Sequence, residues 1–328
     1  MKALVYTGPE ALDFRDVPDP VPATDHHLIQ IDSVGICGSD MHAYLGHDDR
    51  RPAPLILGHE AAGTVTGGPM DGARVTINPL VTCGHCSACA AGRDNLCATR
   101  QIISMQPREG AFAQFVVMPE RNLVSVPDGI SLEMAALAEP VAVGWHAVRL
   151  GLEALNAEQA TSALVIGGGA IGVATAISLI AQGVARVTLI EPNPLRRDYL
   201  NLGNNVTVLA PDDVMGKVFD LSVDCVGYDA TRATACAATR PGGVILHVGL
   251  GGGTAGLDIR RMTLQEISFI GTYTYTAQDF RDTCCAMFDG RLGPLDWTQT
   301  RPLGDGAQAF SDIREGRIPA PKIILKPE

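Results

Sequence analysis

The sequence predicts an α/β protein that combines a doubly wound parallel sheet with a second, β-rich domain. From about residue 163 to residue 271, short apolar strands alternate with helical stretches, which is typical of crossover units in a parallel sheet. The first 140 residues differ, because their short alternating runs are interrupted by glycine and proline, as in an antiparallel, barrel-like domain. A chain of 328 residues has room for about two such domains. We expect the β-rich domain over residues 1–140 and 272–328, and the parallel sheet over residues 141–271.

Each element is predicted by a local pattern. Alternation of apolar and polar residues in the β-rich domain predicts strands at 28–34, 63–66, 74–77 and 114–117. Apolar and β-branched runs predict the strands of the parallel sheet at 163–166, 186–190, 206–209, 221–226, 243–248 and 267–273. The apolar stretch 170–182 follows a glycine-rich turn and predicts a buried helix, whereas the polar stretch 194–202 begins with proline and predicts an exposed helix.

Composition excludes several classes of protein. Asp and Glu number 36 against 25 Lys and Arg, which gives a net charge of −11 and disfavours binding to nucleic acid or anionic membranes. Hydrophobic residues make up 46% of the chain, too many for a largely disordered protein. Residues 161–185 carry no charge and are long enough for a membrane span, but three consecutive glycines favour a strand, a turn and a helix instead. The N-terminus lacks the apolar run of a signal peptide, so we expect a cytoplasmic protein.

Four of the nine cysteines form the strongest chemical signal. Cys83, Cys86, Cys89 and Cys97 are separated by two, two and seven residues, a spacing that lets four thiolates surround one metal ion. An iron–sulfur cluster would continue with a three-residue gap and Cys-Pro, and a nucleic-acid zinc finger would have basic surroundings. The odd number of cysteines also argues against a disulfide framework. The pattern therefore favours a structural zinc site in a reducing compartment.

A glycine-rich turn follows the first strand of the parallel sheet. The segment 167–172 matches G-x-G-x-x-G, in which Gly167, Gly169 and Gly172 allow a tight turn and close approach of a pyrophosphate to the backbone. Glu191 follows 19 residues later at the end of the second strand, where a carboxylate accepts hydrogen bonds from ribose hydroxyls and repels the extra phosphate of NADP. Arg196 and Arg197 lie nearby and weaken the preference for NAD. The alternative is a buried glycine-rich turn without a ligand.

A third group of residues combines the side-chain types of a catalytic zinc site. Cys37, Ser39, Asp40 and His42 lie close together, and the segment 58–60 adds His59 and Glu60. A thiolate, an imidazole and a carboxylate are a workable ligand set for zinc. Spacing alone does not join the two segments, since a single cysteine or histidine more often packs in a core.

These motifs, in this order and over essentially the whole chain, resemble those of the medium-chain zinc-dependent alcohol dehydrogenases. The similarity is strongest to the polyol, threonine and butanediol branch, because Glu139 stands where the classical alcohol dehydrogenases have cysteine. The resemblance implies a Rossmann nucleotide-binding domain, which would be the parallel sheet, and a GroES-like catalytic domain. It also implies a homodimer or homotetramer that acts on small-molecule alcohols.

The resemblance assigns roles to individual residues. It implies two zinc ions per chain, one structural and held by the four cysteines, the other catalytic and held by Cys37, His59 and a carboxylate. Glu60 and Glu139 both remain candidates for that carboxylate. Ser39 corresponds to the hydroxyl that takes the alcohol proton, His42 to the next member of the relay and Asp40 to the acid that orients the histidine ligand. Cofactor contacts fall on Gly167, Gly169, Ala170, Ile171, Gly172, Glu191 and Arg196, with NAD favoured over NADP.

The chain departs from the family pattern where substrate specificity is set. The arginine–tyrosine pair by which sorbitol dehydrogenases bind substrate is replaced by Thr274 and Tyr275, so the guanidinium that would clamp a polyol is absent. We therefore expect NAD-linked oxidation of a secondary alcohol to a ketone, with a small diol, hydroxy acid or amino alcohol favoured over a long polyol. Two alternatives remain open, a reductase of the same fold without catalytic zinc and a non-catalytic, zinc-stabilised nucleotide sensor.

Overall fold

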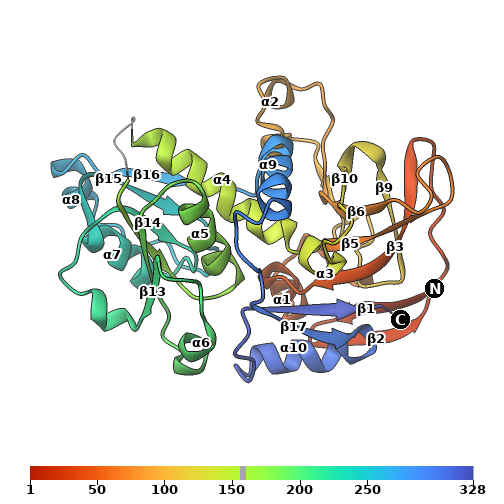
Figure 1. The fold of residues 1–328 in the computed structure, drawn as a ribbon. Helices are drawn as coiled ribbons and strands as arrows, with labels where there is room; N and C mark the ends of the chain where they lie inside the picture. The colour runs from red at the N-terminus through yellow and green to blue at the C-terminus, as the bar shows by residue number, and fades with distance from the viewer. Residues whose placement is uncertain (156–159, 328) are drawn as a thin grey trace. The chain divides into compact units, whose positions relative to one another are not determined.

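The computed structural model describes residues 1–155 and 160–327, which form two compact units (Figure 1). The first unit comprises Met1–Glu139, Thr276–Asp289 and Leu295–Glu328, and the second comprises Pro140–Tyr275 and Gly290–Pro294. Most of the last fifty residues therefore return to the N-terminal unit. Among the described residues no helix is both long and apolar enough to cross a membrane. The uncharged stretch 161–185 is divided between a strand and a helix.

The first unit is built on a seven-stranded sheet. Its central strand β3 (His26–Gly35) pairs with β5 (Glu60–Thr66), β9 (Phe115–Pro119) and β18 (Lys322–Lys326). Most pairs are antiparallel, and β18 runs parallel to β17. The smaller strands of this unit are β1 (Lys2–Gly8), β2 (Ala11–Asp16), β4 (Leu55–Ile56), β6 (Arg74–Ile77), β7 (Leu80–Val81), β8 (Gln101–Ile102), β10 (Leu123–Ser125) and β17 (Thr298–Pro302). The predicted β-rich, GroES-like architecture is confirmed.

The first unit also contains five helices and three 3₁₀ turns among its described residues, and some of them pack against its core. The helices are α1 (Gly38–Tyr44), α2 (Ser87–Ala90), α3 (Leu132–Ala135), α9 (Ala277–Phe288) and α10 (Gly306–Arg314), with 3₁₀ turns η1 (Asp94–Leu96), η2 (Glu120–Asn122) and η4 (Leu303–Asp305). Phe310 on α10 packs edge-on against Phe112, with ring centroids 6.0 Å apart, and lies 5.2 Å from the ring of Tyr44 on α1. These aromatic contacts fix α1, which carries several of the candidate site residues.

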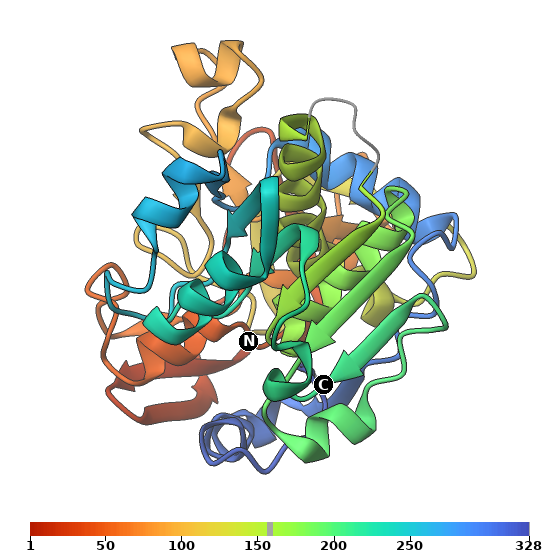
Figure 2. The same cartoon turned by 90° about the vertical axis from the view of Figure 1, so that its left-hand side faces the viewer.

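The second unit contains a six-stranded sheet in which every neighbouring pair is parallel. Its strand order is β13-β12-β11-β14-β15-β16, and Figure 2 shows these strands side by side. Strands β12 and β13 are added on one side of β11, and the chain then crosses to add β14, β15 and β16 on the other side. The strands are β11 (Ser162–Ile166), β12 (Arg186–Ile190), β13 (Val206–Leu209), β14 (Phe219–Asp224), β15 (Thr239–His247) and β16 (Ser268–Gly271). The helices are α4 (Ala138–Ala154, which begins in the first unit), α5 (Ala170–Ala181), α6 (Pro194–Tyr199), α7 (Asp229–Ala238) and α8 (Ile259–Leu264), with the 3₁₀ turn η3 (Pro211–Val214). This order confirms the predicted Rossmann sheet.

Several boundaries differ from the sequence prediction by a few residues, and two of these differences have a local reason. The helix predicted over 194–202 ends at Tyr199, because Leu200 adopts extended backbone and buries its side chain. Strand β15 begins at Thr239, four residues earlier than predicted, and the Thr239 hydroxyl bonds at 2.8 Å to Ser222 of the neighbouring strand. A buried hydroxyl pair between strands gives no apolar signal in the sequence.

Candidate active site and metal centres

Two glycines allow the segments around Cys37 and His59 to come together. A Cβ on Gly35, at the end of β3, would lie 2.1 Å from a carboxylate oxygen of Glu60 on β5. Gly58 has φ +89°, and a Cβ there would lie 2.5 Å from the ring of Phe112. Gly58 needs the left-handed conformation and leaves no room for a side chain, and at Gly35 a Cβ would displace the Glu60 carboxylate from its place. The two strands therefore place their ends against each other.

Three candidate ligands meet at this point. One donor atom each from Cys37, His59 and Glu60 lies within 4.8 Å of the others. Cys37 is half-buried at the N-terminus of α1, and His59 and Glu60 are buried. A thiolate, an imidazole and a carboxylate at this separation fit a zinc ion. Glu139, in the first turn of α4, is buried but does not belong to this group of donor atoms.

Asp40 orients the ring of His59. Its carboxylate is fully buried, accepts hydrogen bonds from the backbone N–H groups of Cys37 (3.0 Å) and Gly58 (3.2 Å), and lies 3.4 Å from His59 Nδ1. Burial opposes ionisation of Asp40, but the neighbouring His59 and then Arg51 hold the pKa of the carboxyl below its usual value. A carboxylate facing Nδ1 favours the proton on that nitrogen, which leaves Nε2 available as a metal ligand.

A lysine from the C-terminal strand compensates the charge of Glu60. Lys322 Nζ lies 2.6 Å from both carboxylate oxygens of Glu60 and donates a further hydrogen bond to the carbonyl of Ile36 at 2.9 Å. Burial disfavours the ammonium form, yet the negative charges of Glu60, Cys37 and Glu139 hold the pKa of Lys322 above its usual value. The site therefore contains a buried cation that sequence reasoning did not predict.

The predicted proton-relay residues lie on α1. Ser39 is half-buried in its first turn, and His42 is exposed in its last turn. Because they are three residues apart on one helix, they lie on the same side of it. The buried guanidinium of Arg51 approaches Ser39, with Nη2 3.5 Å from the hydroxyl oxygen and Nη1 3.4 Å from the backbone carbonyl. Arg51 is a second residue that sequence reasoning missed.

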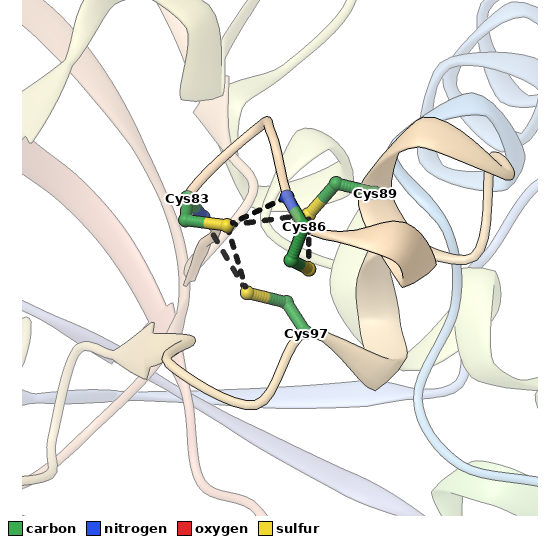
Figure 3. A group of neighbouring side chains, drawn as sticks. All are labelled: Cys83, Cys86, Cys89 and Cys97. Carbon is green, nitrogen blue, oxygen red and sulfur yellow. Dashed lines mark hydrogen bonds between the residues drawn. The ribbon is translucent and has the colours of Figure 1, made fainter.

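The four cysteines form a separate cluster in the first unit (Figure 3). Their sulfur atoms approach to 3.5 Å between Cys86 and Cys89 and to 3.6 Å between Cys83 and Cys97. Backbone amides of His85 and Cys86 donate to the sulfur of Cys83 and lower the pKa of that thiol to about 5, which favours the thiolate. All nine cysteines are described and all are thiols. A closed set of four thiolates fits structural zinc.

The nucleotide motif has the expected backbone geometry in the second unit. Gly167 has φ +100°, and a Cβ on Gly172 would lie 1.7 Å from the carbonyl oxygen of Gly167. Helix α5 begins at Ala170, directly after the turn, so its first amides, including those of Ala170 and Ile171, are free of intrahelical bonds, as phosphate binding requires.

Glu191 is fixed at the end of β12. Its carboxylate accepts hydrogen bonds from the backbone N–H groups of Gly168 and Asn193, both at 2.8 Å. Arg197 donates to the backbone carbonyls of Glu191 and Pro192, both at 2.8 Å, and so acts as a cap on this turn. Arg196 is half-buried on α6. The turn thus presents a fixed negative charge next to the glycine-rich loop.

Comparison with known proteins agrees with both units. Residues 23–128 match the family described as "Alcohol dehydrogenase GroES-like domain", and residues 170–288 match the family described as "Zinc-binding dehydrogenase". The chain is 32% identical over 275 residues to the L-idonate 5-dehydrogenase of Vitis vinifera, covering 75% of this chain and 73% of that protein. It is 29% identical over 308 residues to the L-galactonate-5-dehydrogenase of Escherichia coli, covering 89% and 88%.

Solved structures of dehydrogenases and reductases are similar to this chain over almost its whole length. The acetophenone reductase of Geotrichum candidum, solved in complex with NAD, is 25% identical to this chain with a TM-score of 0.87. The match covers 99% of this chain and 96% of that one. The L-idonate 5-dehydrogenase of Escherichia coli is 25% identical with a TM-score of 0.85, covering 99% of this chain and 97% of that one. The chain belongs to the zinc-binding, medium-chain alcohol dehydrogenases, a family of oxidoreductases that act on CH–OH groups.

Proposed function

We propose that this chain oxidises a secondary alcohol to a ketone with NAD as the hydride acceptor. The observation that carries the proposal is the convergence of Cys37, His59 and Glu60 donor atoms within 4.8 Å, next to the Ser39 hydroxyl on α1. Zinc bound there would supply Lewis acidity to the alcohol oxygen, and bound NAD would accept the hydride. Ser39 Oγ takes the alcohol proton, and the exposed His42 imidazole passes it to solvent.

Charge compensation favours Glu139 over Glu60 as the carboxylate ligand at rest. The thiolate of Cys37 and one carboxylate balance the two positive charges of zinc. Lys322 already neutralises Glu60 through both oxygens, at 2.6 Å each. Glu139 raises the pKa of Lys322 after Glu60 and Cys37, so its negative charge also acts on this site. We therefore assign Cys37 and His59 as resting ligands and propose Glu139, which lies outside the group of converging donor atoms, as the carboxylate that completes the set when zinc binds, while Lys322 holds Glu60.

The cofactor is NAD, by the same reasoning from charge. The Glu191 carboxylate is fixed by two backbone amides, and a second phosphate on the adenosine ribose would meet this negative charge. The Arg197 guanidinium donates from Nη1 to the backbone carbonyls of Glu191 and Pro192, at 2.8 Å each. The four-cysteine cluster holds a second, structural zinc ion.

The substrate is a secondary alcohol, with hydroxy acids as the first candidates and small diols next. Two of the relatives described above are named as dehydrogenases of idonate and galactonate. The chain lacks the arginine of the polyol-binding pair, and Tyr275, which takes the place of its tyrosine, is buried. The loss of this guanidinium clamp disfavours neutral polyols such as sorbitol.

The assembly is a homodimer or homotetramer in the cytoplasm. Strand β16 ends the six-stranded sheet, and Phe269 on it is partly exposed. An open edge strand with an exposed aromatic residue is suited to pairing with a second copy. All nine cysteines lie in the described residues and none of them forms a disulfide, which is consistent with a reducing compartment.

The test is NAD⁺ reduction by purified protein across hydroxy acids, diols, amino alcohols and polyols, with hits repeated on NADP⁺. We expect turnover of one substrate group that is lost in Cys37→Ser and kept in the control Cys285→Ser, because Cys285 is an exposed thiol on α9. Turnover that survives Cys37→Ser would contradict the assigned zinc site.

A further inference from the structure

Arg51 is a buried cation beside the candidate active site. It is 3% exposed, although it stands in the run Asp48-Asp49-Arg50-Arg51, which has the composition of a solvated loop. Its guanidinium is paired at Nη1 with the Asp48 carboxylate at 2.6 Å and donates from Nε to the backbone carbonyl of Ser104 at 3.0 Å. A buried guanidinium is costly unless its donors are used, and the planar fork of arginine fixes the groups that accept from it.

Ser104 shows what one of these bonds maintains. This residue is fully buried and has φ +71°, a backbone conformation that costs energy for any residue except glycine. Its hydroxyl lies 3.3 Å from His59 Nδ1, the same nitrogen that faces Asp40. The strained backbone keeps this contact only if something holds it, and the Arg51 Nε donor does so at the Ser104 carbonyl.

The same guanidinium reaches the other side of the site. Its Nη1 and Nη2 atoms approach the carbonyl and hydroxyl oxygens of Ser39 at 3.4 and 3.5 Å. Three segments that are separate in sequence thus meet at one planar group: the start of α1, the loop at Asp48 and the loop at Ser104. We propose that Arg51 is a positioning residue, which fixes the Ser39 hydroxyl and, through Ser104, the ring of His59. This inference rests on the proposed function of the site.

The neighbouring arginine provides a matched control. Arg50 binds the same carboxylate, with Nε 2.8 Å and Nη2 3.0 Å from the two oxygens of Asp48, but its side chain is 62% exposed. Arg50→Lys and Arg51→Lys therefore change the same side-chain type on the same partner and preserve the charge. Only the second removes a buried fork that contacts Ser39 and Ser104.

The experiment compares these two variants in two measurements. The first is steady-state kinetics, in which kcat and the KM for NAD⁺ are separated. The second needs no turnover and follows release of zinc to a chelating dye, with Cys97→Ser used to remove the signal of the four-cysteine cluster. Arg51→Lys should lower kcat about 10-fold or more, leave the KM for NAD⁺ unchanged and release the remaining zinc faster by about the same factor. Arg50→Lys should match the parent protein in both.

Ser104→Ala keeps the inference testable if Arg51→Lys folds poorly. This variant leaves the guanidinium in place and removes the hydroxyl that contacts His59, so zinc release should again be faster. Where both fold, Arg51→Lys should have a smaller effect on zinc release in the Ser104→Ala background than alone, because the two residues act through one contact. Equal zinc release and equal kcat in Arg51→Lys and Arg50→Lys would overturn the inference. If the parent protein reduces NAD⁺ with none of the alcohols in the panel, the proposed function is refuted. The rate of zinc release would still decide the role of Arg51.

Discussion

Lys322 and Glu60, which are 262 residues apart in the chain, form a buried ion pair at the candidate active site. The antiparallel pairing of β18 with β3, in which Ile324 lies opposite Gly35, brings the lysine beneath the segment that leads to Cys37. Both side chains are almost completely buried, and the ammonium group is 2.6 Å from each carboxylate oxygen. Strand β18 thus supplies the cation that compensates the negative charge of Glu60.

Loss of this lysine should destabilise the first unit strongly. Lys322→Met leaves the Glu60 carboxylate buried without its partner, and we expect the free energy of unfolding to fall by about 3 kcal/mol or more. Urea denaturation measures the change. Lys326→Met is the control on the same strand, because Lys326 pairs with the partly exposed Asp32 and should cost about 0–1 kcal/mol. The double variant Lys322→Met/Glu60→Gln should recover part of the loss, and equal losses in the two single variants would contradict this account.

The charge of Glu191 should determine the choice of cofactor. Glu191→Gln keeps the size of the side chain and removes the negative charge, so the ratio of kcat/KM for NADP⁺ to that for NAD⁺ should rise by about 10-fold or more. Initial rates with both cofactors measure the ratio. Asp198→Asn removes a charge from an exposed position on α6 and should leave the ratio unchanged. If the ratio does not change in Glu191→Gln, this carboxylate is not the group that discriminates between NAD⁺ and NADP⁺.

The four-cysteine cluster should contribute to stability more than to chemistry. Its loop is attached to α9, because both carboxylate oxygens of Asp94 accept from the backbone N–H of Ala277 at 3.1 Å. Cys97→Ser should lower the melting temperature by several degrees while kcat of the folded fraction stays within about 3-fold. Thermal unfolding and active-site titration of the same sample measure both quantities. A variant with unchanged melting temperature and no turnover would show that the cluster is catalytic.

Asp220 should give the second unit a pH-dependent contribution to stability. Its carboxylate accepts from the backbone amides of Thr161 and Ser162, at 2.9 and 3.0 Å, and is paired with Arg240 at 2.6 Å. Burial opposes ionisation, but the bonds from Arg240 and the two amides lower the pKa of Asp220 to about 2. A depressed pKa means that the stabilisation is complete above the ordinary value of 3.8 and is lost as the pH falls towards 2.

The corresponding variant is Asp220→Asn. At pH 7 it should cost about 1–2 kcal/mol of unfolding free energy after allowance for solvent screening, and the difference from the parent should shrink below about pH 4. Urea unfolding at pH 7, 5, 4 and 3 follows this change. Asp212→Asn, at an exposed aspartate, should show no such trend. A difference that stays constant down to pH 3 would assign the effect to packing.

Sequence reasoning succeeded where the signal is local. The cysteine cluster, the glycine-rich turn and the alternation of strands and helices each lie within short windows, so spacing alone indicates their structure. It could not find Lys322, because a single lysine in the last strand looks like a surface residue until β18 is paired with β3. Arg51 stands in a run of four charged residues, which is usually exposed. The choice between Glu60 and Glu139 depends on where a distant cation lies, and no local pattern reports that.

The most direct test of the account is the number of zinc ions per chain in the parent protein and in Cys37→Ser, measured by elemental analysis together with NAD⁺ reduction. Two separate metal centres predict two zinc ions per chain in the parent, and one in Cys37→Ser with turnover abolished. Two zinc ions and undiminished turnover in Cys37→Ser would contradict the assignment of Cys37 and His59 as the catalytic centre.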